Sequence, residues 1–285
     1  MTEWNDNDYA GMLLLDRMNE STDATDALHA FAMDELLCRQ AGEGGPAICH
    51  LWRHPRAFIL GQRDARLPYA AAAIARLAQA STQAAVRSSG GAAVPLDMGV
   101  VNVSLILPIG RAEEAGPRFN HDFERMYTLV RQALASVNVY SQIDKGEIAG
   151  AYCPGDYDLS IGGLKFCGIA QRRQAKALIV HAFVVAEGSG RDRAAAVRAF
   201  YNEAAGDIAP SSKTYPLVEP GSTASLEELT AIGAQASATF AEGVKRVIRA
   251  CQQPDAIARS AANLRLPDAQ QLAAMVESLR SRYLV

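Results

Sequence analysis

The sequence predicts an α/β fold of the α+β type, in which helices flank a mixed, largely antiparallel sheet. Apolar runs with strand character cluster between residues 46 and 186, and helical patterns come before, among and after them. The two kinds of segment do not alternate regularly, as repeated βαβ units would. Apolar residues make up 49% of the 285 residues and charged residues 21%, which is typical of a globular protein that buries a sizeable core.

Each element in the first half of the chain has a local signal. Asp23 or Thr25 is expected to cap the first helix, and Pro68 lies in the first turn of the second. The elements expected up to residue 137 are, in order, a helix at 23–40, strands at 48–53 and 57–60, a helix at 68–80, a strand at 84–86, a glycine turn at 87–91, a strand at 100–107 and a helix at 123–137.

Later in the chain, Gly162 and Gly163 separate two apolar runs, a pattern that predicts a β-hairpin. A strand at 177–186 and a helix at 191–203 follow. After Pro210 the chain is rich in proline and then becomes helical in pattern. We therefore expect a catalytic domain at 1–220 and a helical C-terminal segment at 221–285.

Composition excludes several classes of function. The formal charge of −3 gives no basic excess for nucleic acid. The acidic N-terminus lacks the features of a secretory signal, and no apolar run is long enough to span a bilayer, so we expect a cytoplasmic protein without membrane partners. Five cysteines at scattered spacings without a CxxC pair argue against disulfides and a metal site.

Cys153 is the thiol whose surroundings suggest chemistry. It lies between Tyr152 and Pro154-Gly155, in a turn where a thiol is more accessible than in a strand. Lys165 follows twelve residues later across the predicted hairpin, and an ammonium beside a thiol favours the thiolate. On this pattern alone Cys153 is either a nucleophile or a structural thiol. Cys167, inside a strand, is expected to be buried.

Other polar residues have plainer interpretations. The turn at 87–91 is a tight turn or a place where backbone approaches a ligand. No two of the five histidines form a recognisable pair. Arg172-Arg173 is a solvated rim or a contact for an acidic partner, and Asp156 and Asp158 are expected to stabilise a turn.

Two stretches resemble motifs of the biotin/lipoate protein ligase superfamily. Residues 86–94 and 97–104 resemble its lipoyl-site motif, and residues 162–170 (GGLKFCGIA) resemble its lysine motif, in the expected order. The similarity covers about residues 25–215. It implies the catalytic-domain fold of that superfamily.

Within the superfamily, residues 151–161 and 168–173 resemble the octanoyl-[GcvH]:protein N-octanoyltransferases. The resemblance implies an acyltransferase of lipoate biosynthesis that moves an octanoyl group from a lysine of the glycine cleavage H protein to lipoyl-domain lysines of 2-oxoacid dehydrogenase subunits. It implies a thioester on Cys153, a catalytic Lys165 and no cofactor, because one amide replaces another without ATP. The substrate-binding residues that it implies are Arg87, Ser89, Gly90, Gly91, Asn102, Gly168 and Ala170.

Three alternatives remain at this point. An octanoyl-acyl-carrier-protein:protein octanoyltransferase would use the same cysteine with another donor. An ATP-dependent lipoate-protein ligase usually has an arginine pair before the glycines and a His-Asp pair after them, whereas this chain has Arg87-Ser88 and Leu96-Asp97. A lipoyl- or biotin-binding module without catalysis would not need Cys153 and Lys165.

Overall fold

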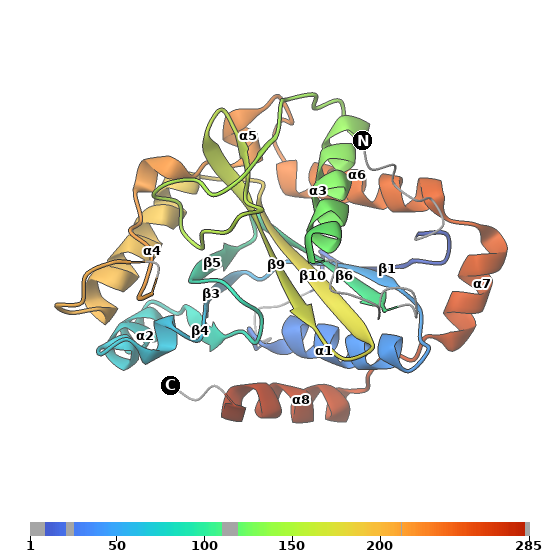
Figure 1. Cartoon of the computed structure of the whole chain (residues 1–285), viewed down its shortest axis with the longest axis horizontal. Coiled ribbons are helices and arrows are strands. Elements are labelled where there is room, and N and C mark those ends of the chain that lie inside the picture. Colours follow the sequence, from blue (N-terminus) through green and yellow to red (C-terminus); the bar gives the residue numbers. More distant parts are fainter. Residues whose placement is uncertain (1–8, 21–25, 110–118, 212, 283–285) are drawn as a thin grey trace.

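The computed structural model describes residues 9–20, 26–109, 119–211 and 213–282, and a seven-stranded sheet lies at its centre (Figure 1). The strand order is β1-β2-β6-β10-β9-β8-β7. β1 pairs with β2 in parallel, and the other pairs in this sheet are antiparallel. Its strands are β1 (Leu13–Arg17), β2 (Ile48–Trp52), β6 (Val100–Pro108), β7 (Asp144–Lys145), β8 (Leu159–Ile161), β9 (Leu164–Arg173) and β10 (Ala177–Val185). The predicted fold class is confirmed.

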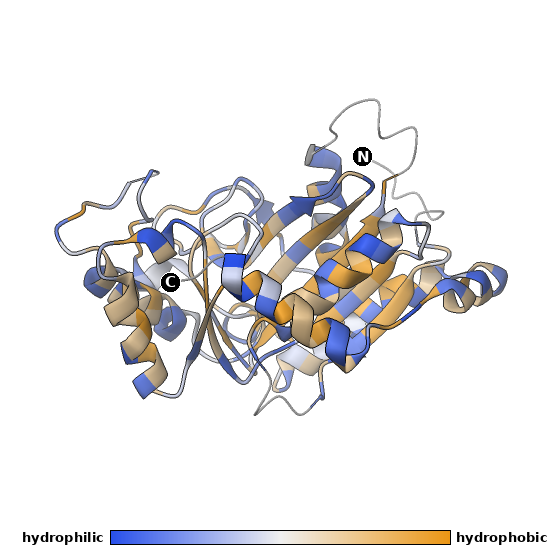
Figure 2. Ribbon diagram, turned by 90° about the horizontal axis from the view of Figure 1, so that it is seen from below, coloured by the Kyte–Doolittle hydropathy of each residue, from blue (hydrophilic) through white to orange (hydrophobic). Residues whose placement is uncertain are grey.

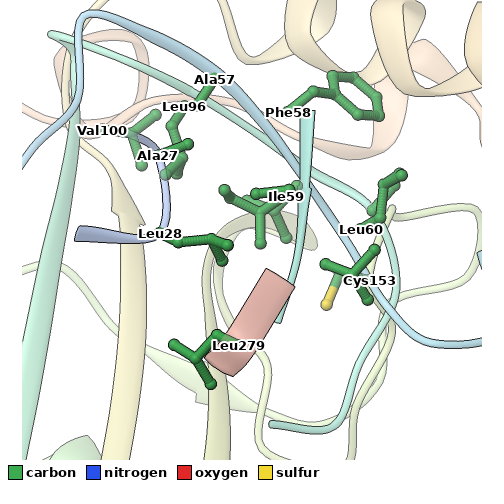
Figure 3. Close-up of a cluster of buried hydrophobic side chains, with 14 of the residues drawn as sticks. Ala27, Leu28, Ala57, Phe58, Ile59, Leu60, Leu96, Val100, Cys153 and Leu279 are labelled. Atoms are coloured by element: carbon green, nitrogen blue, oxygen red, sulfur yellow. The ribbon is translucent and has the colours of Figure 1, made fainter. Parts of the chain in front are cut away.

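A second sheet of three strands lies beside the first, in the order β4-β3-β5 (Figure 1). It consists of β3 (Arg56–Leu60), β4 (Gln83–Val86) and β5 (Val94–Asp97). The strands at 48–53 and 57–60, expected in one sheet, therefore belong to two. The small sheet packs its apolar residues into the same core as helix α1, and Figure 3 shows Cys153 at the margin of that core.

Helices cover both faces of the large sheet (Figure 1). α1 (His29–Gly42) and α8 (Ala269–Arg282) pack together on one face, whereas α3 (Phe119–Ser136) and α6 (Ala236–Cys251) pack on the other. The remaining helices are α2 (Ala70–Gln79), α4 (Gly190–Ala204), α5 (Leu226–Leu229) and α7 (Pro254–Asn263). Figure 2 shows hydrophobic residues concentrated in the strands, while the helices alternate between hydrophobic and hydrophilic residues, as amphipathic covering helices do.

β6 shows how the sequence turns polar residues toward one face. Val101, Val103 and Leu105 point to the α3 and α6 side, where they are fully buried. Because side chains alternate along a strand, Asn102 and Ser104 point to the α1 side. Two buried polar groups thus lie within an otherwise apolar strand, on the face that carries the site described below.

Several elements differ from the expectation. The first helix begins at His29, and the expected caps Asp23 and Thr25 lie outside the described residues. β1, β5 and β7 were not expected, since they are short and lack a clear alternation. The hairpin at Gly162-Gly163 is confirmed by β8 and β9.

The chain after residue 220 is helical in the described residues and packs against the rest. α6 lies against α3, and α8 lies against α1. The division into 1–220 and 221–285 stays a prediction. Among the described helices, none combines the length and apolarity that crossing a membrane requires.

The start of α4 makes a close backbone contact with the segment that follows residue 220. A Cβ at Gly190 would lie 2.6 Å from the backbone N and 2.7 Å from the backbone C of Ala224. We expect Gly190→Ala to lower the free energy of unfolding by about 1–3 kcal/mol, because the overpacked backbones must separate. Urea unfolding followed by circular dichroism measures this.

Gly221→Ala is the matched control, since a Cβ at Gly221 would meet no atom within 4 Å. It should change the unfolding free energy by less than about 0.5 kcal/mol. Equal stability of the two variants would show that the contact between α4 and Ala224 does not constrain the fold.

Candidate active site

Cys153 lies in the turn that precedes β8, in a left-handed backbone conformation with φ of +48°. Residues other than glycine seldom adopt this conformation, which clusters at functional sites. The side chain is buried, and its sulfur accepts two hydrogen bonds. Arg87 Nη2 donates to Sγ at 3.2 Å, and the backbone N–H of Ala92 donates to it at 3.3 Å. Two N–H donors, one of them cationic, therefore face the thiol.

The loop between Arg87 and Ala92 folds around the Arg87 guanidinium. Arg87 Nε donates to Gly90 O at 3.0 Å, and Nη2 also donates to Ala92 O at 2.6 Å. Gly91 has a φ of +104°, and a Cβ there would lie 2.8 Å from Cys153 Sγ. The glycine at this position is thus required both by the backbone conformation and by the approach of the sulfur.

Lys165 is fully buried, and its ammonium lies beneath the Cys153 turn. Nζ donates to Tyr152 O at 2.9 Å, to Cys153 O at 2.6 Å and to Asp158 Oδ2 at 2.7 Å. An ammonium has three N–H groups, so these three acceptors use all of them. Lys165 therefore fixes the peptide bonds on both sides of Cys153.

Asp158 balances the buried ammonium. Its Oδ2 also accepts the backbone N–H of Gly155 at 3.2 Å, which closes the turn, as expected for this aspartate. Burial raises the pKa of Asp158 to about 6, although the Lys165 charge opposes this shift. At neutral pH and above, the carboxylate is charged and the ion pair with Lys165 is intact.

The hairpin explains how Lys165 reaches the turn. Gly162 and Gly163 have positive φ and reverse the chain, so that Lys165 pairs with Ser160 in the neighbouring strand. The sequence predicted that Lys165 lies close to Cys153, and the structure places it there. The sequence also predicted that Lys165 is the cation acting on the thiol, whereas the structure places Arg87 at the sulfur.

A cavity of about 370 Å³ opens at Cys153, a size within the range of small-molecule sites. All seven residues expected to bind substrate line it, namely Arg87, Ser89, Gly90, Gly91, Asn102, Gly168 and Ala170. Lys165 lies behind this wall. A Cβ at Gly168 would collide with the Phe183 ring, so the glycine leaves room for that aromatic wall.

We divide the cavity lining into two parts, and the first, called the inner lobe, is largely apolar and mostly buried, with Phe31, His181 and Phe183 partly exposed. It lies on the α1 side of the large sheet, between that sheet and the small one. Its wall is formed by Phe31, Trp52, Ile59, Val94, Leu96, Asn102, His181 and Phe183. Asn102 of β6 pairs with Phe183 of β10, and Phe183 pairs in turn with Gly168 of β9. The three residues therefore lie in one row across the sheet.

The other part, the outer lobe, is more exposed. Its wall is formed by Asn120, Phe123, Gly155, Asp156, Tyr157, Ile169 and Gln171. The cavity is lined by four consecutive residues of β9, Gly168 to Gln171, and successive residues of a strand face opposite sides. The cavity lining therefore includes residues from both sides of β9, and Cys153 belongs to the same lining.

A buried polar network supports the wall of the inner lobe. Asp34 accepts from Ser104 Oγ at 2.6 Å and contacts His50 Nδ1 at 2.7 Å, while His181 Nδ1 lies 3.2 Å from Ser104 Oγ. Burial lowers the pKa of His181, which keeps its imidazole neutral at pH 7. The sequence did not reveal this network, because its members are far apart along the chain.

The remaining candidates have structural partners. Cys167 is fully buried, as expected, and burial raises its pKa. Arg172 binds Glu35 on α1 through two nitrogens, at 2.7 and 2.9 Å, and Arg173 lies 3.5 Å from Asp122 on α3. None of the five cysteines, all of which lie among the described residues, forms a disulfide. Within the described ranges, no cluster of histidine, cysteine and carboxylate side chains is arranged to hold a metal.

The sequence missed the residues that shape the cavity. Trp52, Ile59, Leu96 and Phe183 read as ordinary core residues, since nothing in a strand's alternation separates a residue facing a cavity from one facing packed atoms.

We expect Arg87→Met to lower the rate at which iodoacetamide alkylates Cys153 at pH 7 by about tenfold, because the thiolate loses a charge-assisted hydrogen bond. Arg87→Lys, which keeps the charge, should lose less. Mass spectrometry of the Cys153 peptide gives the rates. The control is Arg191→Met on the exposed start of α4. An unchanged rate in Arg87→Met would remove Arg87 from thiolate stabilisation.

Comparison with known proteins gives the family. The model of the lipoyl protein ligase A/B catalytic domain matches residues 26–251. A Bacillus velezensis protein named octanoyl-[GcvH]:protein N-octanoyltransferase is 42% identical over 206 residues, which cover 72% of this chain and 70% of that protein. A Listeria monocytogenes protein named lipoyl-[GcvH]:protein N-lipoyltransferase is 38% identical, with 72% of each chain covered.

Solved structures share the fold. A crystal structure of lipoate-protein ligase A bound with ATP superposes with a TM-score of 0.62 at 17% identity, covering 96% of this chain and 95% of that one. The cavity, the motifs and the relatives agree: this chain belongs to the lipoyl protein ligase A/B catalytic-domain family.

Proposed function

We propose that this protein is an amidotransferase of lipoate biosynthesis that carries an octanoyl group on Cys153. It takes the group from a lysine of the glycine cleavage H protein and passes it to lipoyl-domain lysines of 2-oxoacid dehydrogenase subunits. The observation that supports this proposal most directly is the position of Cys153 Sγ. The sulfur accepts two N–H hydrogen bonds and lines the same cavity as the apolar inner lobe. Relatives named octanoyl-[GcvH]:protein N-octanoyltransferase, at about 40% identity, support the donor.

In the first half-reaction the Cys153 thiolate attacks the octanoyl carbonyl of the donor amide. A C–S bond forms, the C–N bond breaks, and the leaving nitrogen takes a proton from water to depart as a neutral amine. Arg87 and the Ala92 N–H stabilise the thiolate before attack. Since all three Lys165 donors are occupied, backbone N–H groups of the turns around Cys153 are the candidates for stabilising the oxyanion.

In this scheme Lys165 and Asp158 position the nucleophile. Their ion pair holds the carbonyls of Tyr152 and Cys153, and with them the left-handed conformation that points the sulfur at the cavity. In the second half-reaction an acceptor lysine attacks the thioester. One amide is exchanged for another, so the reaction is close to isoenergetic and needs no ATP, and the kinetics are ping-pong.

Intact-protein mass spectrometry tests the proposal. Mixing the protein with octanoylated H protein should give a single octanoyl adduct on Cys153, and adding an apo lipoyl domain should remove it. Cys153→Ala and Cys153→Ser should form no adduct and transfer nothing. Cys251→Ala, which changes a thiol outside the cavity, is the matched control and should behave like the wild type.

Other outcomes separate the rival functions. An adduct formed only with octanoylated acyl carrier protein would identify that protein as the donor. Transfer that requires ATP and leaves no thioester would identify a ligase. Substantial transfer by Cys153→Ala would refute the nucleophile.

A further inference from the structure

We propose that the outer lobe binds the side chain of the substrate lysine, with Gln171 as the acceptor for its Nε–H and the Phe123–Tyr157 pair as the wall for its aliphatic stem. This rests on the proposed function. If the inner lobe holds the acyl chain and Cys153 carries the carbonyl, the lysine must extend in the other direction, into the outer lobe.

The shape and burial of the cavity support this direction. The chain continues from Cys153 through Pro154 and Gly155 to Tyr157, and these residues line the cavity from the thiol to the outer lobe. Inner-lobe residues such as Ile59 and Val94 are almost completely buried, whereas Asn120 and Asp156 are exposed. A protein-bound lysine therefore enters past the outer lobe.

The edge of β9 leaves this passage open. β8 pairs with β9 only as far as Cys167, and in the part of the chain that the structure describes no other strand pairs with the outer edge of Gly168–Arg173. A lysine side chain can thus cross from the α3 side to the thiol beside this edge.

Gln171 provides an acceptor at this place. Its Nε2 donates to Asp122 Oδ2 at 2.7 Å, and because a carboxylate only accepts, this contact fixes which way the amide points. Its Oε1 is buried but receives no hydrogen bond from any described residue. A buried acceptor without a donor is unfavourable, so a shift of the Gln171 side chain that brings Oε1 to a substrate N–H gains binding energy.

The neighbouring groups fit a lysine. Phe123 and Tyr157 stack with ring centroids 4.7 Å apart and offer an apolar wall for four methylenes. Asp156 places a carboxylate at the exposed rim, where it attracts the ammonium before it loses its proton. Lys145, the cation beside Tyr157, is paired with Glu124.

Gln171 then serves both half-reactions. It accepts the N–H of the acyl-lysine amide in the donor and an N–H of the free amine in the acceptor. In the second step the amine lone pair forms the C–N bond, and the C–S bond breaks with its electron pair on Sγ. The extra proton on nitrogen leaves to water.

The experiment separates loading from aminolysis. Cys153 is first loaded with S-octanoyl-N-acetylcysteamine, a donor without a lysine, and the thioester is then consumed by apo H protein. Gln171→Leu should lower kcat/KM for aminolysis about tenfold, mainly through KM, since one hydrogen bond to the lysine is lost. The single variant Asp156→Lys should lower kcat/KM for aminolysis by more than Gln171→Leu does, because the new cation repels the ammonium of the incoming lysine.

Two controls keep the result specific. Gln142→Leu changes another glutamine that donates to an aspartate, and Asp207→Lys makes the same charge change at an exposed site, both outside the cavity lining. Both should aminolyse like the wild type. Hydroxylamine has no lysine stem, so it should cleave the thioester of every variant at the same rate.

Aminolysis by Gln171→Leu at the wild-type rate would overturn the assignment. Equal losses in loading, hydroxylamine cleavage and aminolysis would overturn it too, because the substitution would then act on Cys153 itself. If the wild type does not become octanoylated on Cys153 at all, the proposed thioester function is refuted. That result is distinguishable from a failure of the Gln171 assignment, which requires a loaded wild type.

Discussion

The buried ammonium of Lys165 is the constraint on which the site depends. A charge without water is tolerated only when every one of its N–H groups has an acceptor, and Lys165 finds them in one carboxylate and two successive carbonyls. Removing either ionic partner would leave an uncompensated buried charge, at a cost of about 3–5 kcal/mol. The demand of the ammonium for acceptors therefore shapes the turn, and the turn holds Cys153 in a conformation that it would otherwise avoid.

This division of labour separates position from reactivity. Lys165 donates its hydrogen bonds to two backbone carbonyls and to Asp158, and none goes to the sulfur. The hydrogen bonds to the sulfur come from Arg87 and Ala92 instead. Arg87 in turn is held by carbonyls of its own loop, and Arg172, which is paired with Glu35 of α1, lies 3.4 Å from Ser88 O of that loop. The thiol is thus connected to the β8–β9 hairpin on one side and to α1 on the other. Both sheets therefore position the thiol, because Lys165 lies on β9 of the large sheet and Arg87 directly follows β4 of the small one.

The sequence predicted most of the fold, because glycines, prolines and apolar periodicity act locally. The hairpin at Gly162-Gly163 and the buried strand at 100–107 were readable for that reason. β1 and β5 were not, since neither shows a clear alternation and each owes its conformation to a pairing partner distant in sequence.

The site was predicted unevenly for a similar reason. The residues in the two motifs were identified, and all of those expected to bind substrate face one cavity. Which cation meets the sulfur depends on side-chain directions after folding, so Arg87 was placed among the substrate contacts and Lys165 at the thiol. Gln171 and the Asp34–Ser104–His181 contacts join elements that the linear sequence keeps apart.

The length of β8 has a consequence for how such a fold can diverge. β8 has three residues and begins at Leu159, so its pairing with β9 reaches only Cys167. Had the preceding residues continued the ladder, they would have covered β9 from Gly168 onward and closed the route between the two faces of the sheet. A chain with a longer β8 would keep the core and the thiol but would lose the proposed lysine path. The point at which β8 stops therefore matters to the proposed lysine path as much as the side chains that β9 carries.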